Sequence, residues 1–245
     1  MKLKLRTKMI AVFVLWCMMP LGVHAQTWNV PVYGCLAGKS ATAQIPQTQV
    51  AVRTGHEPLD NAMVEDITEL DNAFGVSVPV YFLVNQSQNA FFTPTKFPDL
   101  IRADGANPDM IVTGSVFFGA GLLISEFKAT NGSLMSVPAI MAHEFAHAMQ
   151  YKNSFPYAGK WRELHADYIA GWYIGHRGRY RPQNALQAFL NFYYKGDYDF
   201  FDKGHHGTPQ ERAAAFNAGF NLNVGRNEAS AVNAYNAGLR YVTGR

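Results

Sequence analysis

Cysteine is nearly absent from the 245-residue chain, and this scarcity limits how a fold can be stabilised. The two cysteines are Cys17 and Cys35, and the first lies in an apolar N-terminal run. A mature chain without that run would hold Cys35 alone, so we expect no intramolecular disulfide even in an oxidising compartment. Stability must then come from a hydrophobic core, and about 220 residues are enough to build one.

Charge is also sparse, and the small positive excess is confined to the N-terminus. Charged residues make up 16% of the chain, whose net charge is +3. Lys2, Lys4, Arg6 and Lys8 lie within the first eight positions, whereas the first acidic residue is Glu57. Without these four lysines and arginines the net charge is −1. No basic stripe marks a nucleic-acid surface, so we expect no nucleic-acid partner.

Long apolar runs are missing, and the one near the N-terminus is typical of a secretory signal peptide. A basic start precedes an apolar run at residues 9–22, and a small-x-small cleavage site ends at Ala25. The run is shorter than the ~20 residues of a spanning helix, which makes an uncleaved anchor the weaker alternative. A lipoprotein is weaker still, because Trp16 precedes Cys17. We expect residues 1–25 to be removed, with export to the periplasm or the cell exterior and no stable membrane insertion afterwards.

Repeats and low-complexity linkers are absent from residues 26–245, which we predict to form one domain of the α+β class. Residues 26–56 are mixed and turn-rich. Apolar spacing predicts a helix over residues 59–74 that ends at Gly75. Composition predicts strands over residues 76–84, 90–92 and 110–127, the last as two strands with a bend, and turns over residues 97–108.

The second half of the chain favours helix almost throughout. Candidate helices cover residues 137–152, 161–176, 182–194, 209–220 and 228–241. Pro182 and Pro209 stand where a first helical turn would begin. We therefore expect a small N-terminal sheet with one helix, packed on a mostly helical C-terminal half.

The clearest functional signal is the H-E-F-A-H run at residues 143–147. Residues four apart share a helix face, so His143 and His147 can reach one metal ion while Glu144 projects beside it. This pattern is the H-E-x-x-H zinc site of metallopeptidases, in which the glutamate is the general base. The flanking residues are apolar and small, which disfavours the alternative of a solvated helix face.

A catalytic zinc needs a third protein ligand and one open position. The metzincin extension does not supply it, because Gln150 and Asn153 stand where glycine and histidine would be required. The next predicted helix carries E-L-H-A-D at residues 163–167. Glu163 and Asp167 share a face there, so we predict Glu163 as the third ligand. Asp167 would hold the outer nitrogen of a ligating histidine.

Two alternatives for this helix remain open. His165 points to a different face from Glu163 and could be the ligand in its place. The helix could also be an ordinary amphipathic one, whose acidic residues pair with Arg162 or Lys160.

These motifs and later ones resemble the gluzincin metallopeptidases, and the bacterial neutral zinc metallopeptidase group in particular. Ala146 and His165 depart from the usual residues of that group. The resemblance covers about residues 110–220 and implies a zincin-like fold, a bound Zn²⁺ ion and a peptide or protein substrate. The matching positions are the H-E-x-x-H run, Gln150, the E-L-x-A-D run, Ala170-Gly171-Trp172, His206-Gly207-Thr208, Arg212, Phe216 and Gly219-Phe220.

The function implied is a zinc-dependent endopeptidase with Glu144 as general base. Its oxyanion needs a hydrogen-bond donor besides zinc. The resemblance brings the His206 segment to the site, and Tyr157, Tyr168 and the adjacent His205 are alternative donors. We expect Arg212 to anchor the His206 loop by pairing with an acidic residue rather than to contact substrate. The resemblance also places the peptide-binding sheet edge in residues 119–127.

Two other functions remain open. The chain could be a zinc-stabilised binding or chaperone-like module of the cell envelope. Glu144 argues against this, because a structural site needs no base and closes with four ligands. A zinc hydrolase of cell-wall amides is the other possibility, although no cell-wall-binding repeat is visible.

Overall fold

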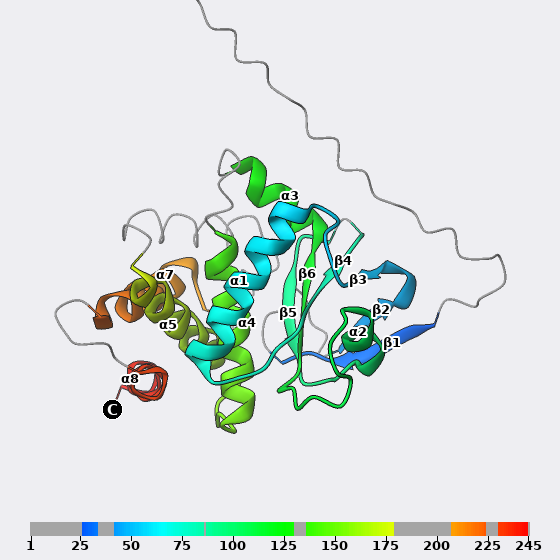
Figure 1. Cartoon of the computed structure of the whole chain (residues 1–245). Helices are drawn as coiled ribbons and strands as arrows, with labels where there is room; N and C mark the ends of the chain where they lie inside the picture. Colours follow the sequence, from blue (N-terminus) through cyan, green and yellow to red (C-terminus); the bar gives the residue numbers. More distant parts are fainter. Residues whose placement is uncertain are drawn as a thin grey trace, which may run out of the picture.

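The computed structural model describes residues 26–33, 42–85, 87–129, 136–178, 207–223 and 230–244. The predicted signal peptide, the helix predicted at residues 182–194, and the residues Cys35, His205 and His206 lie outside this part of the chain. Within it the fold is α+β, as predicted: the short strands come first, with one long helix among them, and the other long helices follow (Figure 1).

The strands form two small sheets. β1 (Thr27–Pro31) and β2 (Thr42–Pro46) make an antiparallel pair. The second sheet has the order β3-β4-β6-β5, with β4 and β6 parallel and the other pairs antiparallel. Its strands are β3 (Val50–Ala51), β4 (Val80–Leu83), β5 (Ala90–Thr93) and β6 (Ser115–Gly119). β5 is therefore an end strand, and it contacts the helix that carries the H-E-F-A-H run.

The helices make up most of the remaining described structure. Among them, none combines the length and apolar character that a bilayer crossing requires. The α-helices are α1 (Glu57–Phe74), α2 (Pro98–Ala103), α3 (Ala120–Ala129), α4 (Val137–Lys152), α5 (Lys160–Arg177), α7 (Pro209–Phe220) and α8 (Ala231–Thr243), and the 3₁₀ turns are η1 (Gln47–Gln49) and η3 (Asn221–Asn223).

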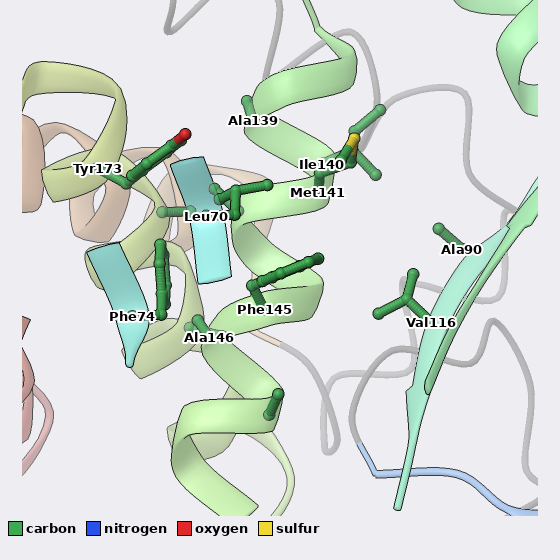
Figure 2. Close-up of a cluster of buried hydrophobic side chains, with 14 of the residues drawn as sticks. Leu70, Phe74, Ala90, Val116, Ala139, Ile140, Met141, Phe145, Ala146 and Tyr173 are labelled. Carbon is green, nitrogen blue, oxygen red and sulfur yellow. The ribbon is translucent and has the colours of Figure 1, made fainter. Parts of the chain in front are cut away.

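The four-stranded sheet is covered on both faces. On one face Ala90 and Val116 point toward α4, beside a cluster in which Leu70 and Phe74 of α1 meet Phe145 of α4 (Figure 2). On the other face Tyr81, Leu83, Phe91 and Phe117 pack against Val30 and Ile45 of the β1–β2 hairpin. Successive side chains of a strand point to opposite faces, and both faces of this sheet are covered. β4, β5 and β6 are therefore buried at every position.

Several helix predictions are confirmed. α4 and α7 have the predicted bounds, and a proline lies in the first turn of each. α1 ends at Gly75, whose φ of 63° is the left-handed conformation that favours glycine at a helix C-terminus. α5 and α8 differ from their predicted bounds by a few residues at each end.

Two predictions were wrong, and a third was incomplete. Residues 110–127 form β6 followed by α3 rather than two strands, because a short apolar run does not distinguish a strand from a buried helix. Residues 97–108, predicted as turns, contain α2. Residues 26–56, predicted only to be mixed and turn-rich, hold three strands, and each of the first two buries only one side chain.

α5 and α7 touch through their backbones, which fixes α7 beside the functional residues of α5. A Cβ added to Gly219 would lie 1.8 Å from the carbonyl oxygen of Tyr168, and one added to Gly171 would lie 1.9 Å from that of Phe216. Backbone atoms cannot move aside as a flexible side chain can. A side chain at either glycine would therefore force the two helices apart.

We expect Gly219→Ala to lower the free energy of unfolding by roughly 2 kcal/mol or more, because overpacking against backbone costs about 1–3 kcal/mol. Chemical denaturation of the purified protein measures this change. Asn217→Ala, at an exposed position of the same helix, is the matched control and should leave the midpoint within about 0.5 kcal/mol. Equal stability of the two variants would contradict the close approach of the helices.

Candidate metal centre

The predicted metal ligands lie on α4 and α5, two helices that pack against each other (Figure 1). α4 is buried from Val137 to Gln150, so its H-E-F-A-H run is enclosed by protein. His143 and His147 of α4 and Glu163 of α5 bring their ligand atoms within 4.8 Å of one another. These three buried residues, the metal group, could hold a metal ion.

The spacing of the metal group fits a small divalent cation. The Nε2 atoms of His143 and His147 are 3.0 Å apart, and they lie 3.3 Å and 3.6 Å from the two carboxylate oxygens of Glu163. Two ligands at about 2.0–2.1 Å from a tetrahedral zinc ion lie about 3.3 Å from each other. Imidazole nitrogen and carboxylate oxygen are also ligand types that zinc accepts.

Hydrogen bonds to the outer nitrogens set the tautomer of both histidines. His143 Nδ1 lies 2.9 Å from Asp167 Oδ1, and His147 Nδ1 lies 2.8 Å from Gln150 Oε1. Both partners are acceptors, so each Nδ1 donates a proton. In the neutral rings each Nε2 is then an acceptor, which is the form that ligates a metal ion. The arrangement therefore favours a bound cation.

Arg212 of α7 holds both acidic residues of α5. Its Nε and Nη2 atoms bond the two oxygens of Asp167 at 2.7 and 2.9 Å, and Nη2 lies 3.4 Å from Glu163 Oε2. Burial raises the pKa of both acids, but Arg212 and the nearby histidines outweigh it and hold each pKa below its ordinary value. Both carboxylates are therefore ionised acceptors at neutral pH.

Arg212 is thus paired with acidic residues, as predicted. Arg162 and Lys160, the alternative partners of these acids, contact other groups. Lys160 pairs with Glu211 instead, and the guanidinium of Arg162 lies over the ring of Tyr33. Only the resemblance drew attention to Arg212, because no local pattern links it to residues 45 positions earlier.

Gln150 and His165 form a chain of hydrogen bonds that ends at His147 of the metal group. Gln150 Nε2 donates to the carbonyl of Arg162 at 2.8 Å and to His165 Nδ1 at 2.9 Å, while His165 Nε2 donates to the carbonyl of Tyr235 at 3.0 Å. Burial lowers the pKa of His165 to about 4, so its ring is neutral. Both of its nitrogens have protein partners, and His165 lies outside the metal group. Apart from the resemblance at Gln150, no pattern in the sequence predicted these hydrogen bonds.

Glu144 lies next to the metal group and is fully buried. Neither of its carboxylate oxygens has a well-aligned hydrogen-bond partner. Burial raises its pKa, whereas His143, His147 and the more poorly aligned N–H of Phe92 act in the opposite direction. A buried carboxylate without a partner is costly, so its position calls for a functional explanation.

Tyr33 also lies beside the metal group, although no local pattern pointed to it. Its ring centroid is 6.4 Å from that of His147 and 5.5 Å from that of Tyr151. The guanidinium carbon of Arg162 lies 4.0 Å from the ring centroid of Tyr33. Burial raises the pKa of Tyr33, while the charge of Arg162 lowers it.

Other predicted site features lie elsewhere. Tyr168 is buried against Tyr241, and Tyr157, which is 37% exposed, packs against Phe155. The sheet edge predicted at residues 119–127 was wrong, because this segment is almost entirely α3. The edge strand that contacts α4 is β5.

Comparisons with known proteins add no family to this description. The chain matches no protein-family model, and searches of curated proteins and of solved structures gave no significant match. The arrangement of the buried side chains on α4, α5 and α7 is therefore what indicates a function.

Proposed function

We propose that the protein is a zinc-dependent endopeptidase of the gluzincin type. The observation that carries this proposal is the pairing of a buried His143–His147–Glu163 group with the buried carboxylate of Glu144, which has no well-aligned hydrogen-bond partner. A structural metal site needs no such carboxylate, whereas a hydrolytic one needs a base beside its open position. In this proposal His143, His147 and Glu163 hold Zn²⁺, and Asp167 orients His143.

The chain's own residues would divide the reaction between them. Zinc, when bound, supplies a Lewis acid for the peptide carbonyl and for a water molecule. Glu144 would take a proton from that water onto its carboxylate and pass it to the leaving amine nitrogen. Its buried position, which raises its pKa above the ordinary value of a glutamate, suits a group that must hold a proton during the reaction. His206 keeps its proposed role as the oxyanion donor.

The substrate would be an extended peptide that adds to the outer edge of β5. This strand ends the sheet and contacts α4, so a peptide along it would run past the metal group. We further propose that residues 1–25 direct export, which N-terminal sequencing of the secreted or periplasmic protein would check.

Metal content tests the proposal most directly. We expect mass spectrometry of purified residues 26–245 to find one zinc per chain, and His147→Ala to lose it because one of three protein ligands is removed. His176→Ala is the matched control, since that ring stacks on Trp172 away from the metal group, and it should keep the metal. A zinc-free protein after metal-replete preparation would overturn the proposal.

A further inference from the structure

The outer edge of β5 is already occupied within this chain. In an antiparallel pair, alternate residues turn their N–H and C=O groups away from the partner strand. The carbonyl of Phe92 faces away from β6, because it accepts a hydrogen bond from the backbone N–H of Tyr33 at 3.0 Å. Ala90 has the same outward orientation, and its N–H is bonded by the side chain of Asn89.

This edge runs beside the proposed general base. The outward N–H of Phe92 lies close enough to the carboxylate of Glu144 to lower the pKa of that carboxyl group. A peptide bound along β5 with its reacting carbonyl at the metal group would therefore donate a hydrogen bond to the carbonyl of Phe92. In this structure Tyr33 donates to that carbonyl instead.

We propose that residues 32–33 stand in the peptide-binding position on β5, so that substrate binds only by displacing Tyr33. This inference rests on the peptide-binding cleft of the proposed function. The ring of Tyr33 also makes displacement by a peptide less favourable, because it contacts His147 and Tyr151 and lies under the guanidinium of Arg162. Tyr33 thus weakens peptide binding by the free energy of these contacts.

Tyr33 can leave without disrupting the fold around it. It lies beyond the end of β1, whose pairing with β2 stops at Pro31. The hairpin is held independently by Val30 and Ile45, which pack on the far face of the sheet. Tyr33 itself is only half-buried. The displacement therefore breaks one backbone hydrogen bond to β5 and the ring contacts.

Two zinc-binding probes of different length test this proposal. Acetohydroxamate binds zinc but is too short to follow β5, whereas an N-acetylated tripeptide hydroxamate can extend along it. We expect Tyr33→Ala and Tyr33→Pro to bind the tripeptide probe about tenfold tighter than the natural chain, a change of about 1.4 kcal/mol. The affinity for acetohydroxamate should stay the same. Tyr33→Phe and the exposed-site control Ile111→Ala should match the natural chain.

Hydrolysis of dye-labelled casein by the same proteins separates the two proposals. Tighter tripeptide binding without hydrolysis by any variant would sink the endopeptidase assignment and leave the role of Tyr33 standing. Hydrolysis by all variants with unchanged tripeptide affinity would overturn the role of Tyr33 alone. Weaker tripeptide binding by Tyr33→Ala would also overturn it, since the ring would then contact the substrate.

Discussion

Replacing Glu144 by glutamine should abolish hydrolysis while the protein keeps its zinc. Glutamine has the same shape, but its amide cannot accept the proton that a general base must take, a step worth about 10²–10⁴ in rate. Because Glu144 is outside the metal group, zinc content should remain at the level of the natural chain. Casein hydrolysis and metal analysis on the same preparation measure the two effects.

The same variant carries a second, independent expectation. Glutamine removes a buried carboxylate that has no well-aligned partner, so the zinc-free protein should become more stable to denaturant. Glu65→Gln, at an exposed position of α1, is the control and should change neither hydrolysis nor stability. Retained hydrolysis in Glu144→Gln would show that another group is the base.

Replacing Glu163 by alanine should lower zinc affinity at least about a hundredfold, more than the same change at His165. Glu163 belongs to the metal group, so its loss removes a ligand. His165 reaches the metal group only through Gln150, which in turn orients His147. Partners of ligands typically contribute 10–100-fold to metal affinity, and His165 is one step further away, so we expect about tenfold or less for it.

Competition with a chromophoric zinc chelator measures both affinities. Asp167→Asn should fall between the two variants, because Asp167 contacts the ligand His143 directly. A larger loss in His165→Ala than in Glu163→Ala would contradict the ligand assignment and move the third ligand to His165. The chelator assay does not depend on any substrate, so the result stands whether or not the protein hydrolyses peptides.

Local spacing predicted the centre of this site but not its surroundings. His143, His147 and Glu163 lie on two helices whose residue patterns are readable in short windows, and the structure confirms that they form a group that could bind a metal. Arg212 and Tyr33 reach the same place from distant parts of the chain. Single-sequence periodicity contains no information about such contacts, and only a resemblance had drawn attention to Arg212.

The errors in the fold have a similar origin. Segment 120–129 buries Leu122, Leu123 and Glu126 at helical spacing, but its apolar start continues directly from β6. Without a polar break the two elements are a single run in the sequence, and the strand prediction was extended through it. α7 was predicted accurately because Pro209 marks its start.

The contact of Arg212 with α5 has a consequence for the order of events during synthesis. The ribosome synthesises α4 and α5 before α7. The histidines and both carboxylates therefore emerge before the guanidinium of Arg212, which neutralises the carboxylates. Until α7 docks through Gly171 and Gly219, the two acids lack their buried counter-ion and the pair of helices cannot close around them at low cost. We therefore expect metal binding to wait until the chain is nearly finished, because only then does Arg212 reach the two acids beside the histidines.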